Sequence, residues 1–114
     1  MTTIKNQTKK FVIIKKAKIC KSLWAKGTGL MLRKKPDYGM IFIFRKEQPN
    51  PITMFLVFFL IDLLFLDKDK RVVEIKKKLK PFRDYYPKAK SMYVVELPVG
   101  VMGKTAVGDK ILFN

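Results

Sequence analysis

Two carboxylates in apolar segments are the residues of this chain best suited to do chemistry. Asp62 lies within the longest apolar run of the sequence, and Glu96 lies in a shorter one. A carboxylate in such surroundings is either exposed by the alternation of a strand or buried, and burial raises its pKa unless a cation answers it. Arg33, Arg45 or Arg71 could supply that cation through two parallel hydrogen bonds. We take Asp62, Glu96 and Arg33 as the candidate polar site, with either a ligand-binding or a structural role.

Three roles are open for these carboxylates. The first is to orient a ligand or to act as a general acid or base. The second is structural, with Asp62 accepting hydrogen bonds from backbone N–H groups at a bend, and this is the role that we favour. The third is an acid and base pair of Asp62 and Glu96 on neighbouring strands, as in a glycoside hydrolase. Because such hydrolases normally need a larger domain that forms a cleft, we assign no catalytic residue and favour a protein that is not an enzyme.

Composition excludes several other chemistries. The chain has one cysteine, Cys20, and no histidine. An internal disulfide therefore cannot form, a structural zinc site within one chain lacks ligands, and hydrolysis with a histidine base is ruled out. We expect no metal and no cofactor. A lone thiol suits a reducing compartment, and the N-terminal apolar run Phe11–Ile14 is too short for a signal peptide, so we expect a cytoplasmic protein.

Positive charge is concentrated in the first third of the chain. The 114 residues include 25 lysines or arginines and 9 acidic residues, and residues 1–35 hold 11 of the basic residues and no acidic one. Such a segment can bind phosphate-rich partners, with an affinity that falls steeply with salt. The plainer alternative is a lysine-rich surface that keeps the protein soluble. The candidate nucleic-acid contacts are Lys9, Lys10, Lys15, Lys16, Lys18 and Lys21.

The apolar run that contains Asp62 covers residues 51–67 and must be buried. It is too short for a helix that spans a membrane, which needs about 20 apolar residues, and a carboxylate within the bilayer is costly. Its Phe, Val and Ile content favours strands. Because one strand usually has about 5–6 residues, we predict two strands, Thr53–Phe58 and Ile61–Asp67, with a bend between them. A buried core helix is the alternative.

Further strands are predicted from apolar alternation and turn residues. Their bounds are Lys10–Ile19, Gly39–Arg45, Arg71–Lys80, Met92–Leu97 and Asp109–Phe113. Two lysines, Lys15 and Lys77, interrupt the inward faces of their strands. A short helix is expected at Cys20–Lys26, and a turn or one helical turn at residues 99–107.

These elements predict an all-β protein. We expect a small single-domain sandwich or partly open barrel of six to seven mostly antiparallel strands, with one or two short helical turns. Residues 1–9 are predicted to be a flexible basic N-terminal tail, and residues 10–114 a single β-domain. A strand left unpaired at the edge of the sheet would allow a homodimer to form.

Six short motifs, in their order and spacing, resemble the domain of unknown function family number 192. They are Gly29-Leu30-Met31, Gly39-Met40-Ile41-Phe42, Ile61 to Asp67, Arg71-Val72-Val73, Tyr93 to Gly100, and Val107 to Ile111. The resemblance runs from about Cys20 to the end of the chain. It implies a compact β-sandwich domain and lends no activity.

The chain departs from that family ahead of Asp62. Many members carry a polar pattern there, with a His or Trp followed by a basic or amide residue, whereas Thr53 to Phe58 read TMFLVF. Leu60 stands where the family often has proline. If the polar pattern forms a site in relatives, this chain lacks it or has altered it, which lowers the expectation of catalysis.

The sequence therefore favours a small non-enzymatic binding or accessory domain, without identifying its ligand. The alternative is a protein that binds nucleic acid nonspecifically through the basic N-terminal segment. A hydrolase that uses Asp62 and Glu96 is the third hypothesis.

Overall fold

The computed structural model describes residues 1–20, 37–54 and 59–113. This part of the chain contains strands and no helix, so the all-β prediction is confirmed. The strands are β1 (Thr2–Asn6), β2 (Phe11–Cys20), β3 (Gly39–Gln48), β4 (Ile52–Thr53), β5 (Ile61–Leu66), β6 (Val72–Leu79), β7 (Asp84–Tyr85), β8 (Ser91–Leu97) and β9 (Ile111–Leu112). The helix expected at Cys20–Lys26 falls almost wholly outside the described residues.

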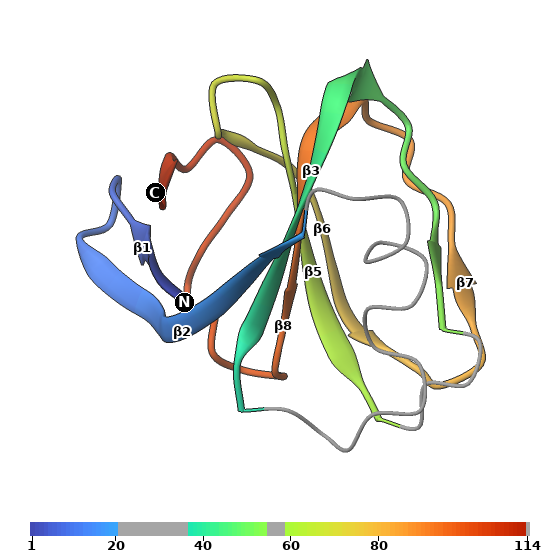
Figure 1. The fold of residues 1–114 in the computed structure, drawn as a ribbon, viewed down its shortest axis with the longest axis horizontal. Helices are drawn as coiled ribbons and strands as arrows, with labels where there is room; N and C mark the ends of the chain where they lie inside the picture. The colour runs from blue at the N-terminus through green and yellow to red at the C-terminus, as the bar shows by residue number, and fades with distance from the viewer. Residues whose placement is uncertain (21–36, 55–58, 114) are drawn as a thin grey trace.

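Seven of these strands form one curled sheet in the order β6-β5-β8-β3-β2-β1-β9 (Figure 1). Its neighbours pair antiparallel except β2 and β3, which are parallel. The remaining strands, β4 and β7, pair with each other as a small second sheet, at the right of Figure 1.

The two ends of the large sheet meet where β6 begins. The Val72 N–H donates to the Asp109 carbonyl at 2.9 Å, and the Gly108 N–H donates to the Val72 carbonyl at 2.8 Å. Arg71 and Lys110 form an antiparallel bridge at the same place. The sheet therefore curls into a half-barrel that closes at one end, which matches the partly open barrel, one of the two architectures that the sequence predicts.

The N-terminus is a strand, so the prediction of a flexible tail over residues 1–9 was wrong for most of it. β1 pairs with β2 on one side and with β9 on the other. Ile4 and Asn6 are fully buried, and the Asn6 side chain donates hydrogen bonds to Thr105 and Asp109. One apolar residue among polar neighbours is too weak a signal for a strand, and the partners that hold β1 include residues about a hundred positions away.

The two lysines that interrupt the predicted strands lie at β-bulges. In β2, Thr2 pairs with Ala17 and Ile4 with Ile14, so two residues, Lys15 and Lys16, lie opposite one. In β6, Lys77 and Lys78 likewise lie opposite the single residue Asp62 of β5. A bulge adds one residue to a strand and resets its alternation. Lys15, Lys16, Lys77 and Lys78 are all exposed as a result.

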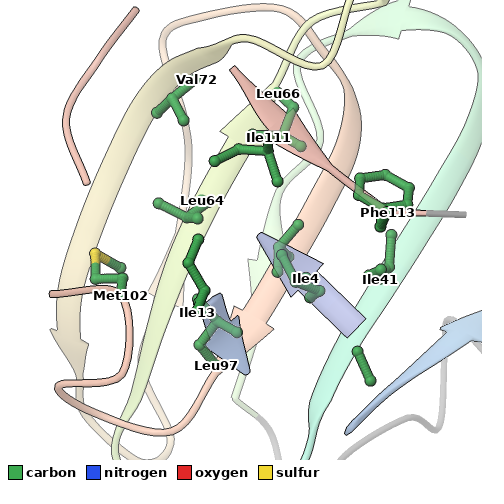
Figure 2. Packing of buried hydrophobic residues seen from close by; sticks show 12 residues of the cluster. Ile4, Ile13, Ile41, Leu64, Leu66, Val72, Leu97, Met102, Ile111 and Phe113 are labelled. Carbon is green, nitrogen blue, oxygen red and sulfur yellow. The ribbon is translucent and has the colours of Figure 1, made fainter. Parts of the chain in front are cut away.

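Strand β5 lies at the centre of two hydrophobic clusters on opposite faces of the large sheet, and all six of its residues are buried. The first cluster includes Leu64 and Leu66 of β5 (Figure 2). Ile4 of β1 and three residues of the C-terminal segment belong to it as well, namely Met102, Ile111 and Phe113. The second includes Leu63 and Phe65, covered in part by Met54 and Tyr85. Burial on both faces explains the continuous apolar run, since each such side chain contributes roughly 1.5–3 kcal/mol.

The predicted strand Ile61–Asp67 is thereby confirmed as β5, and the alternative of a core helix does not apply to it. The other half of the run differs from the prediction. Strand β4 covers Ile52–Thr53, and residues 55–58 of the predicted strand Thr53–Phe58 lie outside the described residues.

Candidate functional site

Asp62 is buried, and both of its carboxylate oxygens accept hydrogen bonds from the backbone. Oδ1 accepts the Lys78 N–H at 2.8 Å, and Oδ2 accepts the Gly100 N–H at 3.0 Å. Lys78 belongs to the bulge of β6, and Gly100 lies in the turn after β8 with φ +93°, a conformation that favours glycine. Asp62 thus joins a bulge to a turn across the sheet, which is the geometry of the structural role favoured above.

Glu96 is also buried, with 7 % of its surface exposed, and it lies on the other face of the sheet. Its neighbours across β3 and β5 are Met40 and Leu63. Among the described residues, its Oε2 atom has no hydrogen-bond partner. Burial raises the pKa of this carboxyl to about 8, so Glu96 is mostly protonated at neutral pH.

The two carboxylates do not form an acid and base pair. Asp62 pairs with Leu97 and Leu63 pairs with Glu96, so the two carboxylates occupy successive positions of the ladder between β5 and β8. Successive positions place side chains on opposite faces of a sheet. The sheet therefore separates them, and the geometry speaks against the hydrolase hypothesis. Arg33, the third residue of the predicted polar site, lies outside the described residues.

Lys9, a predicted nucleic-acid contact, is engaged within the protein. Its Nζ lies 2.7 Å from Oδ2 of Asp109. Burial alone would raise the pKa of Asp109, but hydrogen bonds from Lys9, Asn6 and the Ala106 N–H lower it to about 2. Lys9 therefore helps to fix the C-terminal segment to β1. Of the other predicted contacts, Lys10, Lys15, Lys16 and Lys18 are exposed, and Lys21 lies outside the described residues.

A basic pocket between β6 and β7, missed by the sequence analysis, brings several cations together. Its volume is about 340 Å³. It is lined by Lys76, Lys78, Leu79, Lys80, Arg83, Asp84 and Tyr85. Four cations therefore face one carboxylate. We call this set the basic pocket.

Tyr85 forms the aromatic wall of the basic pocket. Its ring packs on Phe65 with centroids 5.7 Å apart, and the Nζ of Lys76 lies 5.8 Å from the ring centroid. Its hydroxyl donates to a carboxylate oxygen of Glu74. That hydrogen bond, burial and the charge of Glu74 raise the pKa of Tyr85 to about 12. Glu74 also accepts hydrogen bonds from the N–H groups of Lys88 and Ala89, so it links the Tyr85 side chain to the segment after β7.

A signal for this pocket was present in the sequence. Residues 76–90 read KKKLKPFRDYYPKAK, with seven basic residues and one acidic residue. Strand alternation alone assigns these lysines to a solvated face. The alternation pattern does not show that the chain returns, as β7, beside β6. That return depends on backbone hydrogen bonds of Met54 with Phe82 and with Arg83.

Neither a cluster of metal-ligating side chains nor a membrane-spanning helix occurs in the part of the chain that the structure describes. The Cys, Asp and Glu side chains of these residues form no group of three or more that could hold a metal ion. Within the same residues, no helix is long and apolar enough to cross a membrane.

The fold and its motifs define the class of protein to which the chain belongs. The DUF192 family, described as "Uncharacterized ACR", matches residues 2–113, so the chain is a member of that family. The resemblance predicted from the sequence is confirmed and begins at β1 instead of near Cys20.

Similar proteins include UPF0127 proteins from Pyrococcus and Thermococcus species. The chain is 37% identical over 115 residues to one from Pyrococcus abyssi, with 97% of each chain covered. It is 38% identical over 112 residues to one from Pyrococcus horikoshii, covering 95% of this chain and 96% of the relative. A third, from Thermococcus sibiricus, is 34% identical over 110 residues, which are 93% of this chain and 71% of the relative.

Two solved structures share the fold. A "putative transcription regulator" from Sinorhizobium meliloti has a TM-score of 0.84 at 21% identity, covering 98% of this chain and 91% of that one. A protein of unknown function from Novosphingobium aromaticivorans has a TM-score of 0.81 at 21% identity, covering 97% and 82%. At this identity the likeness establishes the fold alone.

Proposed function

We propose that this protein is a small non-enzymatic binding domain whose ligands are anions held in the basic pocket. The observation that carries the proposal is the lining of the pocket, with Lys76, Lys78, Lys80 and Arg83 against the single carboxylate of Asp84. Lysine ammonium and arginine guanidinium groups bind phosphate and carboxylate through charge-assisted hydrogen bonds.

The size and walls of the pocket support a small ligand. A volume of about 340 Å³ lies at the lower end of the range of ligand pockets, roughly 300–1,000 Å³. Leu79 and Tyr85 supply the apolar part of the lining, and Lys76 is half-buried beside the Tyr85 ring. A partly desolvated cation binds an anion more strongly than a fully exposed one.

The state of the two core carboxylates supports a role without catalysis. Both oxygens of Asp62 accept backbone hydrogen bonds, so this carboxylate is occupied. Glu96 is buried beside Met40 and Leu63 of its own sheet and is not among the residues that line the basic pocket. A nucleophile or general base must reach its substrate, and neither residue lines the pocket.

Calorimetric titration with pyrophosphate near physiological salt tests the proposal. We expect saturable binding to the wild-type protein and a loss of at least about tenfold in affinity when Lys76 and Arg83 become alanine, because two charge-assisted contacts are removed. Lys15→Ala with Lys16→Ala is the matched control, since it removes two exposed lysines from β2 and leaves the pocket intact. Absence of binding to the wild-type protein, or an equal loss in the control, contradicts the proposal.

A second candidate function is nonspecific binding of nucleic acid by the N-terminal lysines. The bulge of β2 supports it, because it exposes Lys15 and Lys16 at adjacent positions, with Lys18 exposed further along the strand. Binding of duplex DNA should then weaken steeply with salt and fall when Lys15 and Lys16 become glutamate. If duplex DNA fails to bind near physiological salt, this function is excluded.

A further inference from the structure

We propose that the basic pocket and the exposed aromatic side chains beside it bind single-stranded nucleic acid. This inference rests on the proposed function, because it names the ligand class of the same pocket. It differs from the second candidate function in its surface, which belongs to β6 and β7 instead of β2, and in its preference for unpaired bases.

The charge of the segment around the pocket extends beyond the pocket itself. Besides the four cations that line it, residues 76–90 include Lys77, Lys88 and Lys90. A groove of positive charge that follows the phosphate backbone is one part of a surface for single strands. The size of the pocket suits one nucleotide unit, and the further lysines can contact neighbouring phosphates.

Exposed aromatic rings provide the second part. Tyr86 is 70% exposed and Phe82 is 56% exposed, which sets them apart from the mostly buried apolar side chains of the core. The Tyr86 hydroxyl donates to Oδ2 of Asp84 at 3.4 Å, and Asp84 lines the pocket, so the Tyr86 side chain lies at its rim. An unpaired base can stack on such a ring, whereas the bases of a duplex are stacked on one another.

The backbone that presents these side chains is held in place. Lys78 and Phe82 have φ angles of 54° and 63°, a region that residues with side chains rarely adopt. The Lys78 N–H is held by Asp62, and the Phe82 N–H by the carbonyl of Met54. Unfavourable backbone conformations that the surrounding structure maintains often mark functional sites. Asp62 thus positions the backbone of Lys78, a lysine of the basic pocket.

Fluorescence anisotropy with a labelled oligouridine of about 12 nucleotides and a duplex of the same length tests the inference. We expect the single strand to bind at least about tenfold more tightly than the duplex near physiological salt. Tyr86→Ala should weaken single-strand binding by about 5- to 100-fold and leave its salt dependence unchanged, because stacking is lost and no phosphate contact is. Tyr86→Phe, which keeps the ring, should stay within about twofold of the wild type.

The charge contacts are tested by Lys78→Glu combined with Arg83→Glu. This variant should bind weakly and show a shallower salt dependence, because about two phosphate contacts are removed. Lys15→Glu combined with Lys16→Glu makes the same change of charge on β2 and should retain most of the binding. Every side chain that is changed in these variants is exposed, so the variants should remain folded. Thermal unfolding checks this.

Three results would overturn the inference: equal affinity for single strand and duplex, wild-type affinity of Tyr86→Ala, or an equal loss in the two charge variants. If pyrophosphate still binds in the basic pocket in any of these cases, the proposed function stands and the assignment to single strands fails. If neither pyrophosphate nor the oligouridine binds, both fail.

Discussion

The pH dependence of stability should be governed by the buried carboxyl of Glu96. Glu96 has a pKa of about 8 in the folded protein, against a usual value of 4.5. Between these values the unfolded chain has lost the proton and the folded protein has kept it, so raising the pH favours unfolding. The difference, at about 1.4 kcal/mol per pKa unit, amounts to about 5 kcal/mol.

Among the described residues, no other group with a shifted pKa titrates in this range. The chain has no histidine. The lowered pKa of Asp109, about 2, affects stability only below its usual value of 3.8, and the raised pKa of Tyr85 acts only between 10 and about 12. A fall in stability between about pH 4.5 and about pH 8 can therefore be attributed to Glu96.

The assay is urea unfolding of the wild-type protein and of Glu96→Gln across this range. The amide is neutral at every pH, so the variant should resemble the wild type near pH 4.5 and exceed its free energy of unfolding by up to about 5 kcal/mol near pH 8. Asp37→Asn, a change at an exposed carboxylate, is the control and should leave the wild-type profile intact. A flat wild-type profile, or a fall that persists in Glu96→Gln, would refute the reasoning.

Two further predictions concern the elements that hold the fold. Asp62→Ala should lower the free energy of unfolding by about 3 kcal/mol or more in urea, because it leaves the N–H groups of Lys78 and Gly100 without their charged acceptor; a loss below about 1 kcal/mol would contradict the structural role. Removing residues 1–6 should destabilise the protein severely, since it deletes a strand paired on both sides and the buried Ile4 and Asn6; an unchanged melting temperature would show that β1 is dispensable.

Much of the fold could be predicted because its signals are local. The apolar run around Asp62 predicts a strand buried on both faces, and β5 is one. Lys15 and Lys77 interrupt the alternation of inward and outward residues, and each lies at a β-bulge. The motif order predicts the family, and the match extends over residues 2–113.

The parts that escaped prediction depend on partners distant in the sequence. Strand β1 is recognisable only once β2 and β9 lie beside it. Lys9 carries a charge typical of a nucleic-acid contact, yet its partner Asp109 is a hundred residues away. Glu74 follows the pattern of an outward residue, but the return of β7 gives it the hydroxyl of Tyr85. The basic pocket arises from the same return, so alternation along β6 alone could not reveal it.

The central claim is that anions bind between β6 and β7, and chemical-shift mapping of the backbone amides during a pyrophosphate titration tests it most directly. The largest saturable shifts should fall on residues of the basic pocket, Lys76–Tyr85, with small shifts on the lysines of β2, Lys15–Lys18. Shifts that are largest on β2, or that are spread evenly over all lysines without saturation, would contradict a binding site at the pocket.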